Sequence, residues 1–292
     1  MQKLIVLTGA SDGIGAAAAR ILSQHGHRLV LVGRTPQKIK HIAEQTKAER
    51  YFAVDYENLD EVSDLANELL KQYSHIDVLA NNAGGIFNGP IKTKNGFEKS
   101  FQINHLAPFL LTYKLLNVLI KSKATVVNTS SIAAKLFGHI DIDDLNSWKG
   151  AEPEQNPESK PSKWSGFKAN RVYGNGKLAN ILHVKSLHHR YHAEGLSAVA
   201  FHPGVIASNF AGDTNSLLNR VYHSFLKIFL ASPEKGGERL AYFAEGIDGN
   251  DWTSGNYYQN KKKTGTTNPQ ASDRNLADRL WSQSLAMLEK FK

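Results

Sequence analysis

The chain has 292 residues, of which 41% are hydrophobic and 21% are charged. This length and composition are typical of one α/β domain with a large core, and no break in composition along residues 1–292 indicates a second domain. The absence of cysteine excludes disulfides, thiolate metal ligands and a cysteine nucleophile. The apolar run at residues 4–7 is too short for a signal peptide or a membrane span, so we expect a cytoplasmic protein without an integral membrane segment.

The formal net charge of +8 raises the alternative of a nucleic-acid binder, because clustered Lys and Arg attract phosphate. The basic residues are scattered, however, and the one tight run, residues 261–263, lies in a polar segment that we expect to be a loop. We therefore predict no nucleic-acid partner. Part of the positive charge would suit a cofactor that carries several phosphates.

The first motif joins a short apolar run to a glycine-rich turn. Residues 4–7 are expected to form a strand buried on both faces, and residues 16–22, rich in Ala, a helix. Between them stand Gly9, Gly13 and Gly15, which would permit a tight turn, close approach of a pyrophosphate and close packing of helix on strand. This context predicts dinucleotide binding, with a plain turn as the alternative.

The second expected strand, residues 28–32, runs into Arg34. An NAD site normally carries an acidic residue at this strand end to hold the ribose 2′-hydroxyl, whereas an arginine accommodates a 2′-phosphate. Arg34 therefore favours NADP(H) over NAD(H), with a surface arginine as the alternative. Thr35 and Pro36 are expected to open a helix that ends near Lys47.

Four more strands are expected, and each ends in residues that could meet a ligand. They are residues 52–54 before Asp55, 78–80 before Asn81–Gly85, 125–128 before Thr129–Ser131, and 196–201 before His202–Gly204. The carboxyl ends of parallel strands line the ligand crevice of open α/β sheets, although the Asn81–Gly85 run also fits an ordinary turn. Because strands alternate with helical patterns at 59–70 and 97–120, we predict a doubly wound, largely parallel sheet.

Three segments between or after these strands carry further expectations. Asn104, inside the helix expected at 97–120, is either a structural tie or a site residue, and Pro108 should bend or restart that helix. Residues 138–170 turn polar and proline-rich, which predicts a surface insertion over the site. An amphipathic helix is expected at 216–230, within a substrate lid at 205–232; core packing and membrane contact are the alternatives.

Tyr173 and Lys177 stand four residues apart, which places them on one face of a helix. A nearby ammonium favours the phenolate and lowers the pKa of the phenol toward neutral pH, so Tyr173 is a candidate general acid or base; a purely structural pair is the alternative. His183, His188, His189 and His192 follow, but without a metal-binding motif and mostly on the expected solvent face. We predict no metal site.

Together these residues resemble the short-chain dehydrogenase/reductase family, most closely its retinol-dehydrogenase-like branch. The resemblance covers nearly the whole chain and rests on the glycine motif, Asn81–Gly84, Asn104, Ser131, Tyr173 with Lys177, and His202–Gly204. It implies a single-domain Rossmann-like fold, a doubly wound parallel sheet with helices on both faces. It also implies an oxidoreductase that moves a hydride between NADP(H) and a small-molecule carbonyl or alcohol, and it is compatible with a homo-oligomer.

The resemblance implies a role for each matching residue. Tyr173 would exchange a proton with the substrate oxygen, Lys177 would lower the Tyr173 pKa and hold the nicotinamide ribose, Ser131 would orient the carbonyl, and Asn104 would help order a water-mediated proton relay. The cofactor-binding positions implied are Thr8, Gly9, Ser11, Asp12, Gly13, Ile14, Gly15, Arg34, Asp55, Asn82, Ala83, Gly84, Tyr173, Lys177, Pro203 and Gly204. Gly174 and Gly176, the latter where the branch commonly has Ser, predict a looser helix start.

We therefore expect an NADP(H)-dependent carbonyl reductase or alcohol dehydrogenase. The apolar pattern at residues 217–230 suggests a lipophilic aldehyde or ketone as its substrate. The alternative is a protein that binds NADP(H) as a sensor or scaffold without turnover. The complete set of Ser131, Tyr173 and Lys177 argues against that alternative, because a non-catalytic protein has no chemical need for it.

Overall fold

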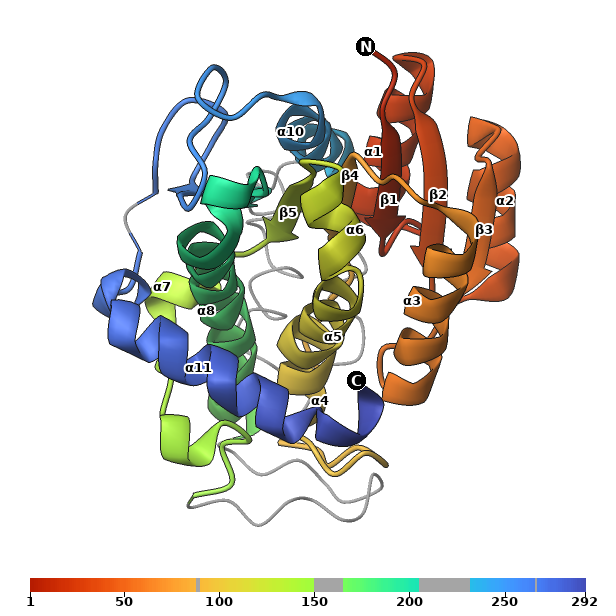
Figure 1. Ribbon diagram of the computed structural model, residues 1–292. Helices are drawn as coiled ribbons and strands as arrows, with labels where there is room; N and C mark the ends of the chain where they lie inside the picture. Colours follow the sequence, from red (N-terminus) through yellow and green to blue (C-terminus); the bar gives the residue numbers. More distant parts are fainter. Residues whose placement is uncertain (88–89, 150–164, 205–231, 266) are drawn as a thin grey trace.

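The computed structural model describes residues 1–87, 90–149, 165–204, 232–265 and 267–292. Its centre is a seven-stranded sheet in the order β3-β2-β1-β4-β5-β6-β7, in which every pairing is parallel (Figure 1). The strands are Leu4–Thr8 (β1), Arg28–Gly33 (β2), Arg50–Ala53 (β3), Val78–Asn81 (β4), Thr125–Thr129 (β5), Ser197–Phe201 (β6) and Tyr257–Tyr258 (β7). The order reverses between β1 and β4, where ligands bind in folds of this class.

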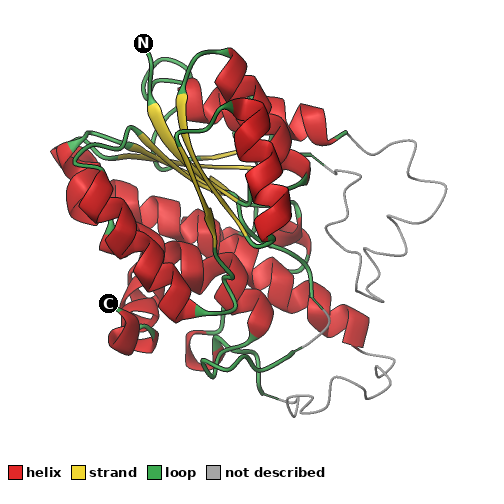
Figure 2. Cartoon of the chain, turned by 90° about the vertical axis from the view of Figure 1, so that its right-hand side faces the viewer, coloured by secondary structure: helices red, strands yellow, loops and turns green. Residues whose placement is uncertain are grey.

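Helices cover both faces of the sheet, as Figure 2 shows. One face packs against α1 (Gly13–Gln24), α2 (Pro36–Thr46) and α10 (Pro233–Glu245); the other packs against α3 (Leu59–Gln72), α5 (Ala107–Lys114) and α8 (Ser165–Tyr191), and α11 (Arg274–Met287) packs on α8. Strand residues alternate between the two cores: Ile5 and Leu7 face the first, Leu4 and Val6 the second. Continuous apolar strands are therefore stable here because both faces are covered.

The remaining elements are short. They are α4 (Lys99–Phe101), the π-helix η1 (Gln102–Leu106), α6 (Leu116–Lys121), α7 (Ala133–Leu136), and the 3-10 turns η2 (Ile142–Asp144), η3 (His192–Glu194), η6 (Pro269–Ser272) and η7 (Glu289–Phe291). Within the described residues, no helix is both long and apolar enough to cross a membrane.

The predicted fold class is confirmed, and all six predicted strands are present within two residues of the expected bounds. The seventh strand, β7, was not predicted. The helix expected at 97–120, with a bend or restart at Pro108, consists of four consecutive pieces, and a π-helix precedes the start of α5 at Ala107. Proline lacks the N–H that an α-helix would need to bond the carbonyl four residues earlier, so Pro108 prevents one unbroken helix.

The expected start of the helix that carries Tyr173 was wrong. Helix α8 begins at Ser165, so residues 165–170 belong to it and not to the predicted insertion. Gly174 and Gly176 consequently lie inside the helix, where close packing requires them. A Cβ on Gly174 would stand 2.8 Å from the Gly138 backbone nitrogen, and one on Gly176 would stand 2.9 Å from the Asn104 Cβ.

Two further expectations concern segments beside these elements. The helix expected at 216–230, and the lid at 205–232 except for its last residue, lie outside the described residues, as do residues 150–164 of the predicted insertion. The described part of that insertion is not purely superficial, since Ile140 and Leu145 are buried. Of the four histidines expected mostly on the solvent face, His189 and His192 are exposed, whereas His183 is buried between Phe109 and Trp281 in the core.

Candidate active site

The loop between β1 and α1 is shaped by its glycines. Gly9 has φ +65°, and a Cβ there would stand 2.8 Å from the Ala83 Cα. A Cβ on Gly15 would stand 2.1 Å from the Gly9 carbonyl oxygen. Both positions therefore exclude any side chain, and they leave the first turn of α1 open toward the carboxyl end of the sheet.

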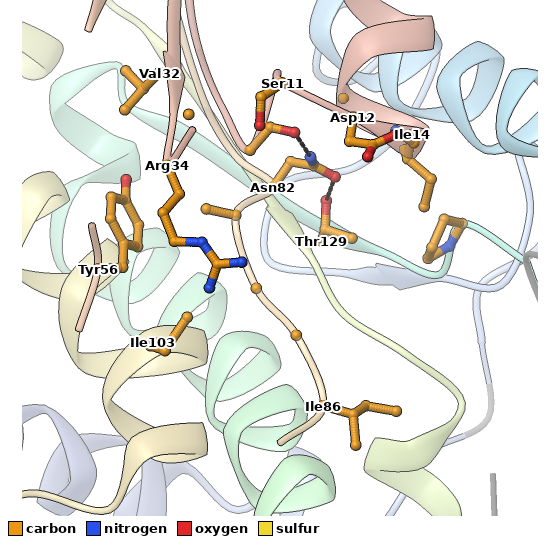
Figure 3. A pocket seen from close by; sticks show the side chains of 18 of the residues that line it. Ser11, Asp12, Ile14, Val32, Arg34, Tyr56, Asn82, Ile86, Ile103 and Thr129 are labelled. Carbon is orange, nitrogen blue, oxygen red and sulfur yellow. Dashed lines mark hydrogen bonds between the residues drawn. The ribbon is translucent and has the colours of Figure 1, made fainter. Parts of the chain in front are cut away.

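Thr8 and Asn82 fix the ends of three strands relative to one another. The buried Thr8 hydroxyl accepts hydrogen bonds from the backbone N–H groups of Asn82 and Ala83 and donates to the Ala80 carbonyl. The Asn82 amide donates to the Thr8 and Gly9 carbonyls, and its oxygen accepts from the Thr129 hydroxyl at 3.2 Å (Figure 3). These contacts tie β1, β4 and β5 together beneath the site.

A pocket of about 340 Å³ lies at this edge of the sheet. It is lined by sixteen of the predicted site residues. Fourteen of them are Ser131, Tyr173 and Lys177 together with Gly9, Ser11, Asp12, Gly13, Ile14, Gly15, Arg34, Asp55, Asn82, Ala83 and Gly84. Pro203 and Gly204 at the end of β6 also line it. Thr8 and Asn104 do not, since both are fully buried behind the lining. The crevice predicted from the strand ends is therefore one continuous pocket.

At one end of the pocket, α8 presents Tyr173 and Lys177, both less than 5% exposed. The Lys177 Nζ donates to the Thr129 carbonyl at 3.1 Å and lies 5.6 Å from the centroid of the Tyr173 ring. Burial lowers the Lys177 pKa to about 7. The Ser131 hydroxyl, on the loop after β5, accepts from the Ala133 N–H at 3.2 Å. A phenol, an ammonium and a hydroxyl thus line the same end of one pocket.

Asn104 acts here through its side chain as a structural tie next to the site. Its amide donates to the Gly85 and Ser100 carbonyls, each at 2.8 Å, and its oxygen accepts from the Gly85 N–H at 3.2 Å. A Cβ on Gly84 would stand 2.5 Å from that oxygen and 3.0 Å from the Lys177 Nζ. Asn104, Gly84 and Lys177 are therefore packed together, with no space for a side chain on Gly84.

Charged side chains surround the other end of the pocket. Figure 3 shows the Arg34 side chain extended from the end of β2 toward the part of the pocket lined by Tyr56 and Ile103. The Lys38 ammonium, in the first turn of α2, lies 2.7 Å from the Asp12 carboxylate. The other Asp12 oxygen caps α1 by accepting from the Gly13 N–H at 2.8 Å. The Lys38 hydrogen bond lowers the pKa of the Asp12 carboxyl, which therefore carries a full negative charge at neutral pH.

Between these ends the wall is mostly apolar. Ile86 packs with Tyr173 and Ala133, and Phe137 lies against them. Tyr56 also lines the pocket, and burial raises the pKa of its phenol. Within the described residues there is no group of three histidine or acidic side chains that could hold a metal ion.

Several lining residues were missed by the sequence analysis: Lys38, Tyr56, Ile86, Phe87 and Ile103. Lys38 had a usable signal, because it follows Arg34 by four residues and opens the helix after β2. Tyr56 had another, since it directly follows Asp55 at a strand end. Ile86, Phe87 and Ile103 had none, because their positions depend on how loop 81–87 folds against η1.

Comparisons with known proteins agree with this geometry. A family model described as short chain dehydrogenase matches residues 3–139. The chain is 32% identical to a candidate daunorubicin C-13 ketoreductase, DnrU, of Streptomyces sp. (strain C5), over 97% of this chain and 92% of that protein. It is also 32% identical to retinol dehydrogenase 12 of Mus musculus, over 98% of this chain and 86% of that protein. The crystal structure of an uncharacterised protein from Mycobacterium paratuberculosis matches with a TM-score of 0.72 and 27% identity, over 99% and 94% of the two chains.

Proposed function

This chain belongs to the short-chain dehydrogenase/reductase family, in its retinol-dehydrogenase-like branch, and from that premise we propose that it is an NADP(H)-dependent oxidoreductase that interconverts a carbonyl and an alcohol. One observation carries the proposal. Tyr173, Lys177 and Ser131 line the same pocket as the glycine loop, whose bare backbone leaves room for a pyrophosphate at the N-terminus of α1.

The residues of the pocket would divide the chemistry as follows. When bound, the nicotinamide supplies or accepts the hydride. Tyr173 gives its phenolic proton to the carbonyl oxygen in reduction, or takes the hydroxyl proton in oxidation. Ser131 donates a hydrogen bond that holds the same oxygen. Lys177, when protonated, favours the phenolate form of Tyr173 and binds ribose hydroxyls. Asn104, whose side chain is held by Gly85 and Ser100, would help to order a water-mediated proton relay from Lys177.

The other lining residues would hold the dinucleotide. Gly9, Ser11, Gly13, Ile14 and Gly15 form the pyrophosphate cradle, and Asp55 would accept from the adenine amine. Asn82, Ala83 and Gly84 would line one side of the adenosine ribose. Pro203 and Gly204 would contact the nicotinamide end of the dinucleotide. Thr8, which is buried behind the pocket lining, would support the pyrophosphate cradle. We propose NADP(H) in place of NAD(H) because β2 ends without an acidic residue and Arg34 follows it, where it would pair with a 2′-phosphate.

A lipophilic substrate is the finer part of the proposal. Ile86, which packs with Tyr173, and Phe87 both line the pocket and give it an apolar surface, which favours an apolar group on the substrate. The names of the two relatives, a ketoreductase and a retinol dehydrogenase, are in keeping with such a substrate. The proposal also retains a cytoplasmic location and a homo-oligomeric state, which cell fractionation and size-exclusion chromatography would test.

The first test measures NADPH oxidation with a panel of aldehydes and ketones that differ in apolar chain length, with NADH in parallel. We expect turnover with NADPH, a higher kcat/KM for substrates with long apolar tails, and loss of turnover in Tyr173→Phe while NADPH still binds. Turnover that survives in Tyr173→Phe would contradict the mechanism. Binding of NADPH without turnover of any panel member would favour a sensor or scaffold.

A further inference from the structure

The Asp12–Lys38 ion pair stands where a cofactor phosphate would bind. Asp12, Arg34 and Lys38 all line the pocket, the first at the N-terminus of α1 and the other two after β2. The pair is exposed, with 56% and 55% of the two side chains accessible. An anionic ligand at this end of the pocket would therefore meet two cations and one anion.

The negative charge of Asp12 is not required for its structural task. Asp12 caps α1 by accepting from the Gly13 N–H, and a neutral asparagine caps helices about as well. The carboxylate lies at the helix N-terminus that would hold a pyrophosphate, so its negative charge repels an anionic ligand there. It also holds the Lys38 ammonium at 2.7 Å, which reduces the attraction that Lys38 can exert on another anion.

Arg34 differs from Lys38 in its pairing with acidic side chains. Within the described residues it makes no ion pair, so its guanidinium is available to a phosphate. Arg20 also faces Asp12 and helps to lower its pKa, but its Nε donates to Gln45 at 3.3 Å and the residue does not line the pocket. The attraction of this end of the pocket for an anionic ligand therefore depends on whether the Lys38 ammonium pairs with Asp12 or with the ligand.

We propose that Asp12 limits the preference of this protein for NADP(H) over NAD(H) by engaging Lys38, and that Lys38 is a second determinant of that preference beside Arg34. This inference rests on the proposed cofactor class and names residues that tune it. A 2′-phosphate has to draw Lys38 away from Asp12 or share it, and the repulsion between Asp12 and the phosphate remains. NAD(H) has no 2′-phosphate, so its binding requires neither the displacement of Lys38 from Asp12 nor the approach of a 2′-phosphate to the Asp12 carboxylate.

The test compares binding of adenosine 2′,5′-bisphosphate and adenosine 5′-monophosphate by calorimetry at low salt, followed by NADP⁺ and NAD⁺. The variants are Asp12→Asn, which keeps the cap, Lys38→Met, which keeps the apolar stem, and their combination. Lys40→Met is the matched control, because Lys40 lies on the same helix but does not line the pocket. Melting temperatures separate loss of helix stability from loss of binding.

We expect Asp12→Asn to raise the ratio of NADP⁺ to NAD⁺ affinity roughly threefold to fivefold, as for removal of one exposed charge. Lys38→Met should lower the ratio roughly threefold, the double variant should lie between the two, and Lys40→Met should leave it unchanged. High salt should shrink all these differences. A ratio that is unchanged or lower in Asp12→Asn would overturn the inference, as would failure of all probes to bind. A wild type that prefers NAD⁺, with the ratio still rising in Asp12→Asn, would instead contradict only the proposed cofactor.

Discussion

The two ends of the pocket control charge in different ways. Tyr173 and Lys177 are buried, and within the described residues no carboxylate pairs with Lys177, whose position is set by a backbone carbonyl and by close packing. Asp12, Arg34 and Lys38 are exposed, and Asp12 and Lys38 are held by each other. Function at the buried end should therefore depend on geometry and dehydration, and function at the open end on charge balance and ionic strength.

Replacing Lys177 should give the largest effect. Burial lowers its pKa from 10.5 to about 7, so between these pH values the unfolded chain binds a proton that the native state does not, and native stability falls as the pH falls from 10.5 to 7. Lys177→Met removes this cost. We expect turnover to drop roughly 10³-fold, while the cofactor-free protein gains roughly 2–4 kcal/mol at pH 7.

Urea unfolding and NADPH oxidation measure these two effects. Lys121→Met is the control, since Lys121 is exposed and outside the pocket, and it should change neither quantity. A Lys177→Met protein that is less stable than the wild type would show that the ammonium is better solvated in the native state than its burial indicates.

Gly84→Ala tests geometry at the same end without changing any charge. The new Cβ would displace the Asn104 oxygen or the Lys177 ammonium, and we expect kcat to fall roughly 100-fold. Gly85→Ala is the matched control, because the three atoms nearest to its Cβ would all belong to the Phe87 ring, which can rotate away. Similar losses in both variants would indicate a general distortion of loop 81–87, and not a specific displacement.

The core behind the buried end should carry a pH dependence of its own. His183 has its Nδ1 3.3 Å from the Asn128 amide nitrogen and its ring against Phe109, and His105 lies beside it. Burial lowers the His183 pKa from 6.5 to about 3, so the unfolded chain takes up the proton first and stability falls as the pH drops from 6.5 toward 3.

His183→Gln keeps an acceptor toward Asn128 and removes this titration. We expect the loss of unfolding free energy between pH 7 and pH 5 to be smaller than in the wild type by roughly 2 kcal/mol. The exposed His189→Gln is the control and should retain the wild-type slope. Equal slopes for His183→Gln and the wild type would mean that other groups, His105 first among them, account for the acid sensitivity.

Arg34→Gln tests the open end and should give the smallest effect. Loss of one exposed cation should weaken NADPH binding roughly fivefold to tenfold at low salt and less at high salt, with little change for NADH. Arg28→Gln, at the other end of β2, is the matched control, because Arg28 pairs with Glu49 outside the pocket. An equal loss of affinity for NADPH and NADH would show that Arg34 contacts a part of the dinucleotide that the two cofactors share.

Local pattern predicted most of the fold, whereas most of the residues that line the pocket were implied by the family resemblance. The apolar runs at β1 and β2 report on a few neighbouring residues, and the strands that they predict are confirmed. The glycines after β1 line the same pocket as Tyr173 and Lys177, but the binding and catalytic roles of these residues stay predictions. The two-residue strand β7 was not predicted, because its own short sequence does not encode its pairing with Ala200 and Phe201.

The errors lie where distant segments meet. Gly174 and Gly176 suggested a loose helix start, whereas the backbone of residues 137–138 and the side chain of Asn104 press against them in the folded protein. The burial of His183, the exception among the four histidines, follows from the packing of α11 over α8, which helical spacing alone does not reveal. The Asp12–Lys38 pair joins two helices and could not be seen from either segment by itself.

The strand order has a consequence for how the protein folds. The β1–β2–β3 half of the sheet forms from near neighbours along the chain, but the crevice exists only once Ile5 pairs with Val78 across the reversal. Closing the long loop between β1 and β4 costs chain entropy before the contacts at the crevice can form. Closure of this loop is therefore one of the slow steps of folding. During refolding, a dinucleotide would therefore find its binding site only after the two halves of the sheet had joined, and it would stabilise the native protein without speeding the early steps.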